Sequence, residues 1–336
     1  MKDQLAAITK SILESTGIPG EIESARHLSA FYARFFPGSE AHSLSQKTNE
    51  VLLKGGIALS SYDAAICMDE YIRTARFIKG VYQAICELKI RFPDQRLHIL
   101  YAGCGPYATL LLPVLPLFEP EDMDVVLLDI NTPSLQSVAA LLPRIGLDTY
   151  SIELLQGDAI HYQSPESRPL HLVISETMFH ALIREPQVSI TGNLAAQLQK
   201  GGILIPEEIN LSLVYTFFTE EPYLKANMEF AEAAPYKHRL HKGLLFSINK
   251  ELDFYRNNNS PGIFESDLYE LPENFEERPD LCIYTQLRIF GGITLEAAES
   301  SITNPYCVNS FYNLQNHTHV KLVYNFKDIP NWTYAL

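Results

Sequence analysis

The chain has 336 residues, of which 46% are hydrophobic and 20% charged, so it is long enough to fold into two domains with sizeable cores. Its formal net charge of -14 argues against binding to nucleic acid or an anionic membrane and weakly favours a cationic partner, although many soluble proteins are simply acidic. Five cysteines without a Cys-x-x-Cys pair argue against a disulfide framework or a metal site. Together with the lack of a signal peptide or a long apolar run, they indicate a cytoplasmic protein without a membrane span.

Residues 1–95 are expected to form an N-terminal helical region. Between Asp63 and Leu88, apolar side chains recur at the spacing of one helix face. The sequence Phe92-Pro93-Asp94 then ends this helix, because the residue before a proline avoids the helical conformation.

Residues 96–206 alternate short apolar runs with helical stretches. Such alternation is typical of a doubly wound parallel sheet with helices on its faces, so we expect an α/β domain here. The predicted strands are Leu97–Tyr101, Asp124–Asp129, Ser151–Leu155 and Leu170–Ser175, and the clearest helices are Thr132–Ile145 and Ile190–Gln199.

Residues 207–336 are richer in Tyr, Phe, Thr and Asn, and several runs alternate apolar with polar residues. These runs, Asn210–Thr216, Cys282–Phe290 and Val320–Phe326, indicate an antiparallel β domain. Residues 220–280 are more polar, and we expect an insertion there that is partly helical and partly loop. The loop includes Asn257-Asn258-Asn259-Ser260-Pro261-Gly262.

A glycine turn follows directly on the first predicted strand of the α/β domain. In Gly103-Cys104-Gly105, the missing side chains let the backbone approach a ligand closely. Dinucleotide enzymes use a similar turn, but Ala108 replaces the third glycine of their motif. The pattern therefore favours a cofactor without a pyrophosphate group.

Two acidic residues occupy the ends of the next two strands. Asp129 can accept hydrogen bonds from ribose hydroxyls, and Asp158 can contact an adenine amine, although either acid alone would equally suit a solvated loop. The glycine turn, Asp129 and Asp158 follow three successive strands, and this arrangement resembles that of the class I S-adenosylmethionine (SAM)-dependent methyltransferases. The resemblance implies SAM as the cofactor. The implied cofactor-binding residues are Gly103, Cys104, Gly105, Asp129, Asp158 and Ala159.

Two glutamates nine residues apart follow the fourth predicted strand. Glu176, Met178 and Glu185 match the double-glutamate loop of the protein arginine methyltransferases, which this segment resembles, although Phe179 and His180 stand where that family usually has Gly-Tyr. The resemblance implies that Glu176 and Glu185 are catalytic and that Met178 and His180 contact the substrate. Alternatively, Glu185 is an acid at the start of the following helix, where the helix dipole favours it.

Two further segments resemble the same family, and the resemblance covers about residues 62–214. Met68–Thr74 resembles a helix that carries an Arg-Thr pair, which implies that Arg73 binds the carboxylate of SAM. Lys200–Pro206 resembles the link into a β-barrel. The implied fold is α/β, with N-terminal helices, a Rossmann-like class I methyltransferase domain and a C-terminal antiparallel β-barrel-like domain. The resemblance also permits a homodimer.

Paired glutamates suit a guanidino substrate for a chemical reason. A guanidinium is planar, always charged and a poor nucleophile. Two carboxylates can grip its N–H groups, aim one nitrogen at a methyl donor and polarise the group toward that nitrogen. The predicted activity is therefore N-methylation of a small cationic guanidino compound.

The chain departs from the family in two places where a peptide substrate would run. It has no Thr-His-Trp sequence, of which His317-Thr318-His319 and Pro330-Asn331-Trp332 are only distant echoes, and Phe31–Phe36 only partly matches an N-terminal aromatic motif. These departures favour free L-arginine over a protein. The alternatives are arginine in a protein or peptide, and a catalytically silent homologue that acts as a binding partner. A silent homologue would be expected to lose a glutamate or the glycine turn.

Overall fold

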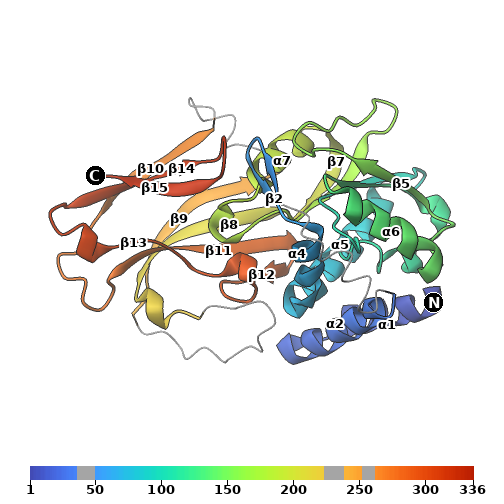
Figure 1. The fold of residues 1–336 in the computed structure, drawn as a ribbon, viewed down its shortest axis with the longest axis horizontal. Coiled ribbons are helices and arrows are strands. Elements are labelled where there is room, and N and C mark those ends of the chain that lie inside the picture. Colours follow the sequence, from blue (N-terminus) through green and yellow to red (C-terminus); the bar gives the residue numbers. More distant parts are fainter. Residues whose placement is uncertain (36–49, 223–237, 252–261) are drawn as a thin grey trace.

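A computed structural model describes residues 1–35, 50–222, 238–251 and 262–336 of the protein. The molecule is elongated, with the N-terminal helices and a parallel sheet toward one end and antiparallel strands toward the other (Figure 1). No helix within these ranges is long and apolar enough to cross a bilayer.

The N-terminal segment forms helices and one short hairpin. Helices α1 and α2 pack on each other and on α5, which in turn contacts strands β6 and β7 of the parallel sheet. The apolar residues Leu5, Ile12 and Leu28 are fully buried in these contacts. The elements are α1 (Lys2–Glu14), α2 (Gly17–Ala33), β1 (Val51–Leu53), β2 (Gly56–Ala58), α4 (Ser61–Ile66), a 3-10 turn (Cys67–Asp69) and α5 (Tyr71–Arg91).

The single helix predicted between Asp63 and Leu88 is wrong near its start, where α4, the 3-10 turn and α5 replace it. Glu70 has a non-helical backbone (φ -80°, ψ 78°). Its carboxylate accepts hydrogen bonds from the hydroxyls of Ser300 and Ser301 and from the amide of Ser301 at 2.9 Å. The break therefore follows from a contact with a segment 230 residues further along the chain, which helical periodicity cannot indicate.

A five-stranded parallel sheet forms the centre of the first half of the molecule. Its strand order is β5-β4-β3-β6-β7, so the order reverses between β3 and β6. The four predicted strands are present, and the central ones are apolar runs covered on both faces, as parallel strands must be. The strands are β3 (Leu97–Ala102), β4 (Met123–Asp129), β5 (Ser151–Gln156), β6 (Leu170–Ser175) and β7 (Leu198–Ile205).

Helix α6 (Thr132–Ile145) has the predicted bounds because its ends are defined locally. Pro133 lies in the first turn, where no N–H is needed, and Gly146 ends the helix in the left-handed conformation (φ 77°).

Helix α7 (Gln187–Ala195) begins and ends earlier than the predicted Ile190–Gln199. Leu198 already belongs to β7, where it pairs with Leu170 of β6. Pairing in the sheet therefore overrides a weak helical pattern at this point.

The second half of the chain forms two antiparallel sheets. The larger has the order β12-β11-β8-β9, with β13 also paired to β11, and in the smaller one β14 lies between β10 and β15. The three predicted alternating runs appear as β8, β11 and β14. The strands are β8 (Glu208–Thr216), β9 (Leu240–Asn249), β10 (Ile263–Glu270), β11 (Asp280–Phe290), β12 (Ile293–Leu295), β13 (Tyr306–Ser310), β14 (His319–Asn325) and β15 (Asn331–Ala335).

The prediction of helix and loop for residues 220–280 is wrong for much of the described part of this segment. That part contains the strands β9 and β10. Both strands carry many exposed polar residues, so their alternation is weak and their pairing with β8 and β14 decides their conformation. Of the predicted loop Asn257–Gly262, residues 257–261 lie outside the described residues. A closed barrel stays a prediction.

Aromatic rings pack the two antiparallel sheets against each other. Phe246 of β9 contacts Phe264 of β10 and Tyr324 of β14, with ring centroids 5.3 and 5.4 Å apart. Tyr324 stacks on Trp332 of β15 at 4.7 Å. These contacts hold the smaller antiparallel sheet against β9 of the larger one.

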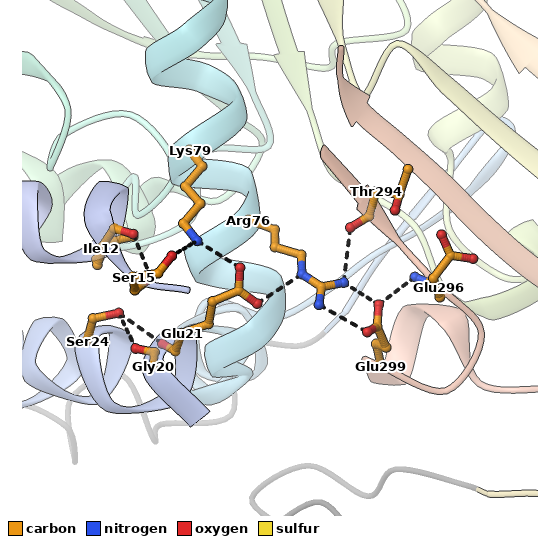
Figure 2. A network of polar contacts seen from close by, with 10 residues as sticks. All are labelled: Ile12, Ser15, Gly20, Glu21, Ser24, Arg76, Lys79, Thr294, Glu296 and Glu299. Atoms are coloured by element: carbon orange, nitrogen blue, oxygen red, sulfur yellow. Dashed lines mark hydrogen bonds and ion pairs between the residues drawn. The ribbon is translucent and has the colours of Figure 1, made fainter. Parts of the chain in front are cut away.

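A network of charged side chains joins the N-terminal helices to the antiparallel half (Figure 2). Glu21 of α2 accepts hydrogen bonds from Arg76 at 3.0 Å and from Lys79 at 2.8 Å, both on α5. Arg76 also forms a two-pronged ion pair with Glu299 and donates to the carbonyl of Thr294 at 3.1 Å. Helix α5 is thereby held from both sides.

Candidate active site

A cavity of about 210 Å³ lies at the carboxyl ends of the parallel strands. Ligands of open parallel sheets bind where the strand order reverses, which here is between β3 and β6. The cavity brings together nearly all residues that the sequence predicted for the site. They are Arg73, Gly103, Cys104, Gly105, Asp129, Asp158, Ala159, Glu176, Met178 and Glu185.

The glycine turn after β3 forms one wall of the cavity. Gly103 and Gly105 both have positive φ angles, 68° and 65°. A Cβ atom at Gly103 would lie 2.4 Å from Cγ2 of Thr177, so only glycine fits at that position. The amide of Gly103 donates to the carbonyl of Leu128 at 2.9 Å, which ties the turn to β4.

The two predicted acidic residues lie where β4 and β5 end. Asp129 is 5% exposed, and its carboxylate accepts hydrogen bonds from the amides of Gly105 and Asn131, each at 2.8 Å. Burial raises the pKa of Asp129 above its ordinary value, while these hydrogen bonds oppose the shift. Asp158 accepts from the amide of Ile160 at 2.9 Å. Carboxylate oxygens can each accept two hydrogen bonds, so both residues keep capacity for a ligand.

Arg73 lines the cavity and forms an ion pair with one of the two glutamates. Its Nη1 forms an ion pair with Oε2 of Glu176 at 2.9 Å, and its Nη2 donates to the carbonyl of Cys67 at 2.8 Å. Its Nε is buried and has no hydrogen-bond partner among the described residues. Buried N–H groups without partners are rare, so this atom points to an acceptor that a ligand would supply.

Both glutamates lie in the cavity wall, where Glu185 is 6% exposed and the side chain of Glu176 is 9% exposed. Burial raises the pKa of Glu176 to about 7, although Arg73 acts to lower it. Burial and the charge of Glu176 raise the pKa of Glu185 to about 8, and the charges of Arg184 and Arg73 compensate only in part. The pair therefore has an unmet demand for positive charge, which a cationic ligand would satisfy.

The loop between the glutamates has a strained backbone. Ala181 (φ 53°), Leu182 (φ 56°) and Arg184 (φ 69°) all adopt the left-handed conformation. Each costs roughly 1–2 kcal/mol for a residue with a side chain. Such a loop persists only where contacts from elsewhere stabilise it.

The antiparallel half supplies three of these contacts. The indole N–H of Trp332 donates to the carbonyl of Ala181 at 2.9 Å, and the hydroxyl of Tyr324 donates to the carbonyl of Leu182 at 2.6 Å. The amide of Ala181 donates to Oγ1 of Thr285 at 2.9 Å. The only Trp in the chain is thus part of the support of the glutamate loop, although it does not line the cavity.

The hairpin β1–β2 supports the other end of the loop. The amide of Ile57 donates to the carbonyl of Arg184 at 2.8 Å, and the amide of Arg184 donates to the carbonyl of Pro330 at 2.7 Å. A Cβ atom at Gly56 would lie 2.5 Å from the nitrogen of Pro186, so the hairpin approaches the chain just after Glu185 very closely. The hairpin and Pro330, the residue just before β15, thereby fix the backbone at Arg184.

His180 is the one predicted site residue that does not line the cavity. Its ring packs between Phe179 and Tyr306, with centroids 4.1 and 5.8 Å away, and burial lowers its pKa to about 4. Phe179 lines the cavity instead. The left-handed residues Ala181 and Leu182 follow directly, and sequence spacing does not reveal such a turn.

Other cavity residues were missed because no motif marks them. The antiparallel half contributes Ser301 and Ile302, and the hairpin segment contributes Leu53 and Ala58. The segment 317–319 is exposed and does not line the cavity. No group of three or more His, Cys, Asp or Glu side chains in the described ranges is arranged to hold a metal ion.

The N-terminal aromatic segment Phe31–Phe36 lies partly behind the cavity wall. Phe31 and Tyr32 are buried on α2, and Tyr32 stacks on Tyr107, which lines the cavity, at 5.7 Å. Phe36 lies outside the described residues.

No protein-family model matches the chain, and no curated protein sequence matches it. Among solved structures, it is similar to Arabidopsis thaliana protein arginine methyltransferase 10 in a uniquely open conformation, with a TM-score of 0.52, 12% identity, and coverage of 79% of this chain and 87% of that chain. It is also similar to the Trypanosoma brucei PRMT1 enzyme-prozyme heterotetrameric complex with AdoHcy, with a TM-score of 0.47, 13% identity, and coverage of 75% and 84%. The first likeness shows a shared fold and confirms the α/β architecture expected from the sequence.

We expect Tyr324→Phe to loosen the glutamate loop. The change keeps the ring but leaves the buried carbonyl of Leu182 without its donor, at a cost of about 1–3 kcal/mol. Tyr215→Phe is the matched control, because the Tyr215 hydroxyl donates to the carbonyl of Glu270 at 2.9 Å. Hydrogen exchange read by mass spectrometry should be faster at residues 179–185 in Tyr324→Phe alone. Equal exchange in the two variants would contradict this function of the hydroxyl.

We expect Glu185→Gln to stabilise the ligand-free protein at alkaline pH. A carboxyl whose pKa is raised on folding, here from 4.5 to about 8, gives stability that is fully present below the unfolded value and lost as the pH rises through the folded value. Glutamine does not ionise, so the melting temperature of the variant relative to the native protein should rise between about pH 5 and pH 9. Scanning fluorimetry across this range measures the difference. An acid that only favours a helix start predicts the opposite, a lower melting temperature for the variant.

Proposed function

We propose that the protein is a SAM-dependent methyltransferase that transfers a methyl group to a guanidino nitrogen, with free L-arginine or a small arginine-like compound as substrate. The observation that carries this proposal is the pair of buried glutamates. Glu176 has a cationic partner in Arg73, whereas the pKa of Glu185 is raised to about 8. A guanidinium supplies the missing charge and enough N–H groups for both carboxylates.

The residues on the other side of the cavity fit SAM. The unpartnered Nε of Arg73 and the remaining acceptor capacity of Asp129 are the groups that a cofactor with a carboxylate and a ribose requires. Arg73 would hold the carboxylate, Asp129 the ribose and Asp158 the adenine, with Gly103 and Gly105 giving room for close approach. When bound, SAM supplies a methyl group on a positively charged sulfur.

Glu176 and Glu185 would act on the guanidinium in two ways. Their oxygens accept its N–H groups and so fix its plane and the direction of one nitrogen, which removes orientational freedom before the reaction. Their negative charge draws the positive charge of the group toward them and leaves that nitrogen more nucleophilic. The nitrogen releases a proton when it is methylated, and one of the two carboxylates that hold it would accept that proton.

The surroundings of the glutamates support a small substrate. The antiparallel half contributes Ser301 and Ile302 to the wall rather than a Thr-His-Trp motif, and the hairpin packs on the glutamate loop through Ile57. The net charge of -14 favours a cation in general. Arginine in a protein or peptide is the alternative, supported by the likeness to protein arginine methyltransferase 10. A homodimer and a cytoplasmic location stay predictions.

The substrate class is tested by incubating the purified protein with SAM and either free L-arginine or an arginine-rich peptide. Mass spectrometry should detect methylated arginine as the faster-formed product. Methylated peptide with unmodified free arginine would establish the alternative. If SAM binds and neither acceptor is methylated, a silent binding protein becomes the better interpretation.

We expect Glu176→Gln and Glu185→Gln each to lower turnover by about 10²–10³-fold while SAM binding survives, because orientation and polarisation of the guanidinium fail together. The double variant should be little worse than the poorer single one, since the residues act as a unit. Glu153→Gln, an exposed charge on β5, is the control. A Glu185→Gln enzyme with native turnover would remove Glu185 from the clamp.

Asp129→Ala should weaken SAM binding, because the ribose loses a charged acceptor worth about 1.5–3 kcal/mol. Asp124→Ala is the matched control at the opposite end of the same strand, where Asp124 forms a surface ion pair with Arg96 at 3.1 Å. Titration calorimetry measures both affinities. Unchanged SAM affinity in Asp129→Ala would exclude the residue from the cofactor site.

A further inference from the structure

Two of the five cysteines face each other across neighbouring strands. Cys282 of β11 pairs directly with Cys307 of β13, next to a register shift between Leu281 and Cys282. Opposed residues of antiparallel strands have Cα atoms about 4.5–5.5 Å apart. Disulfides span about 4.4–6.8 Å between Cα atoms, so this pair is placed for a disulfide without a large backbone movement.

The two thiols differ in exposure and in acidity. Cys282 is fully buried and packs with Val214 and Tyr284, whereas Cys307 is partly exposed. The interaction between the two thiols lowers the pKa of Cys307 and raises the pKa of Cys282. Cys307 is therefore the thiol that reacts with an oxidant first, and Cys282 is the neighbouring thiol that can then form a disulfide with it.

We propose that Cys282 and Cys307 are a redox pair that a hydroperoxide converts into a reversible disulfide. In the first step, the Cys307 thiolate attacks the peroxide, forming a sulfenic acid and releasing water or an alcohol after protonation. In the second step, Cys282 attacks the Cys307 sulfur, its thiol proton joins the departing hydroxide, and water leaves as the S–S bond forms. The two thiols together lose two electrons and the peroxide gains them, and a dithiol reductant reverses the change.

Two of the remaining three cysteines compete poorly for the oxidant. Cys104 is buried, whereas Cys67 is partly exposed. Desolvation nevertheless raises the pKa of Cys67 to about 12 and that of Cys104 well above its ordinary value, so little thiolate is present at either residue. Cys86 lies on α5 and interacts with Tyr82. It serves as a control below.

The disulfide would stiffen one edge of the cavity. Strand β13 follows shortly after Ser301 and Ile302, which line the cavity, and among the described strands it pairs with β11. Tyr306, next to Cys307, packs against His180 of the glutamate loop. A covalent bond from β13 to β11 restrains local opening of this segment.

The test uses the full-length reduced protein and hydrogen peroxide. After denaturation, the five free thiols of the reduced chain should fall to three, with the loss of two hydrogens in mass and a cross-linked peptide containing Cys282 and Cys307. Dithiothreitol should restore all five. Hydrogen exchange at residues 300–310 should be slower in the oxidised form. These measurements do not depend on methyl transfer, so they stand or fall separately from the proposed function.

Two variants sharpen the test. Cys86→Ser should still lose two thiols on oxidation, whereas Cys307→Ser should lose none by intramolecular cross-linking. Peptide mapping of the native chain decides the question even if Cys307→Ser does not fold. The proposal is overturned if Cys282 and Cys307 stay reduced while other cysteines oxidise, if the bond forms between chains, or if exchange at residues 300–310 is unchanged by oxidation.

Discussion

The burial of two carboxylates in one cavity is the constraint on which the rest of the structure depends. A charged carboxylate loses hydration when it is buried, and a second one nearby adds repulsion. Arg73 compensates Glu176, while the pKa of Glu185 rises to about 8, so without a cationic ligand the second carboxyl group is held mainly in its uncharged, protonated form at neutral pH. A site of this kind is costly to maintain without ligand, and the same cost makes it selective for a cation.

The frame that holds these carboxylates comes from distant parts of the chain. Helix α5 positions Arg73, and the ion-pair network around Arg76 fixes that helix between the N-terminal helices and the antiparallel half. Trp332 and Tyr324 bond to carbonyls of the strained loop, and the hairpin bonds to its far end. The antiparallel half thus contributes mainly by fixing a backbone that would not keep its left-handed residues alone.

The two halves of the molecule therefore have different tasks in one site. The parallel sheet gathers the glycine turn, Asp129 and Asp158 at one edge, since parallel strands all end there. The antiparallel half closes the opposite side with Ser301 and Ile302, and Ser301 also donates to Glu70 at the break before α5. A single contact region thereby links the cavity wall, the start of α5 and strand β13, which carries Cys307 of the proposed redox pair.

The sequence by itself determined the features that local chemistry controls. Buried parallel strands are apolar runs, Pro133 and Gly146 mark the ends of α6, and strand ends bring Asp129 and Glu176 to one edge whatever the rest of the chain does. Tertiary structure alone decided three other features. They are the interruption of the helix at Glu70, the polar strands β9 and β10, and the position of His180, which is buried outside the cavity while Phe179 lines it. Each of these depends on partners tens to hundreds of residues away, and a local pattern carries no record of such contacts.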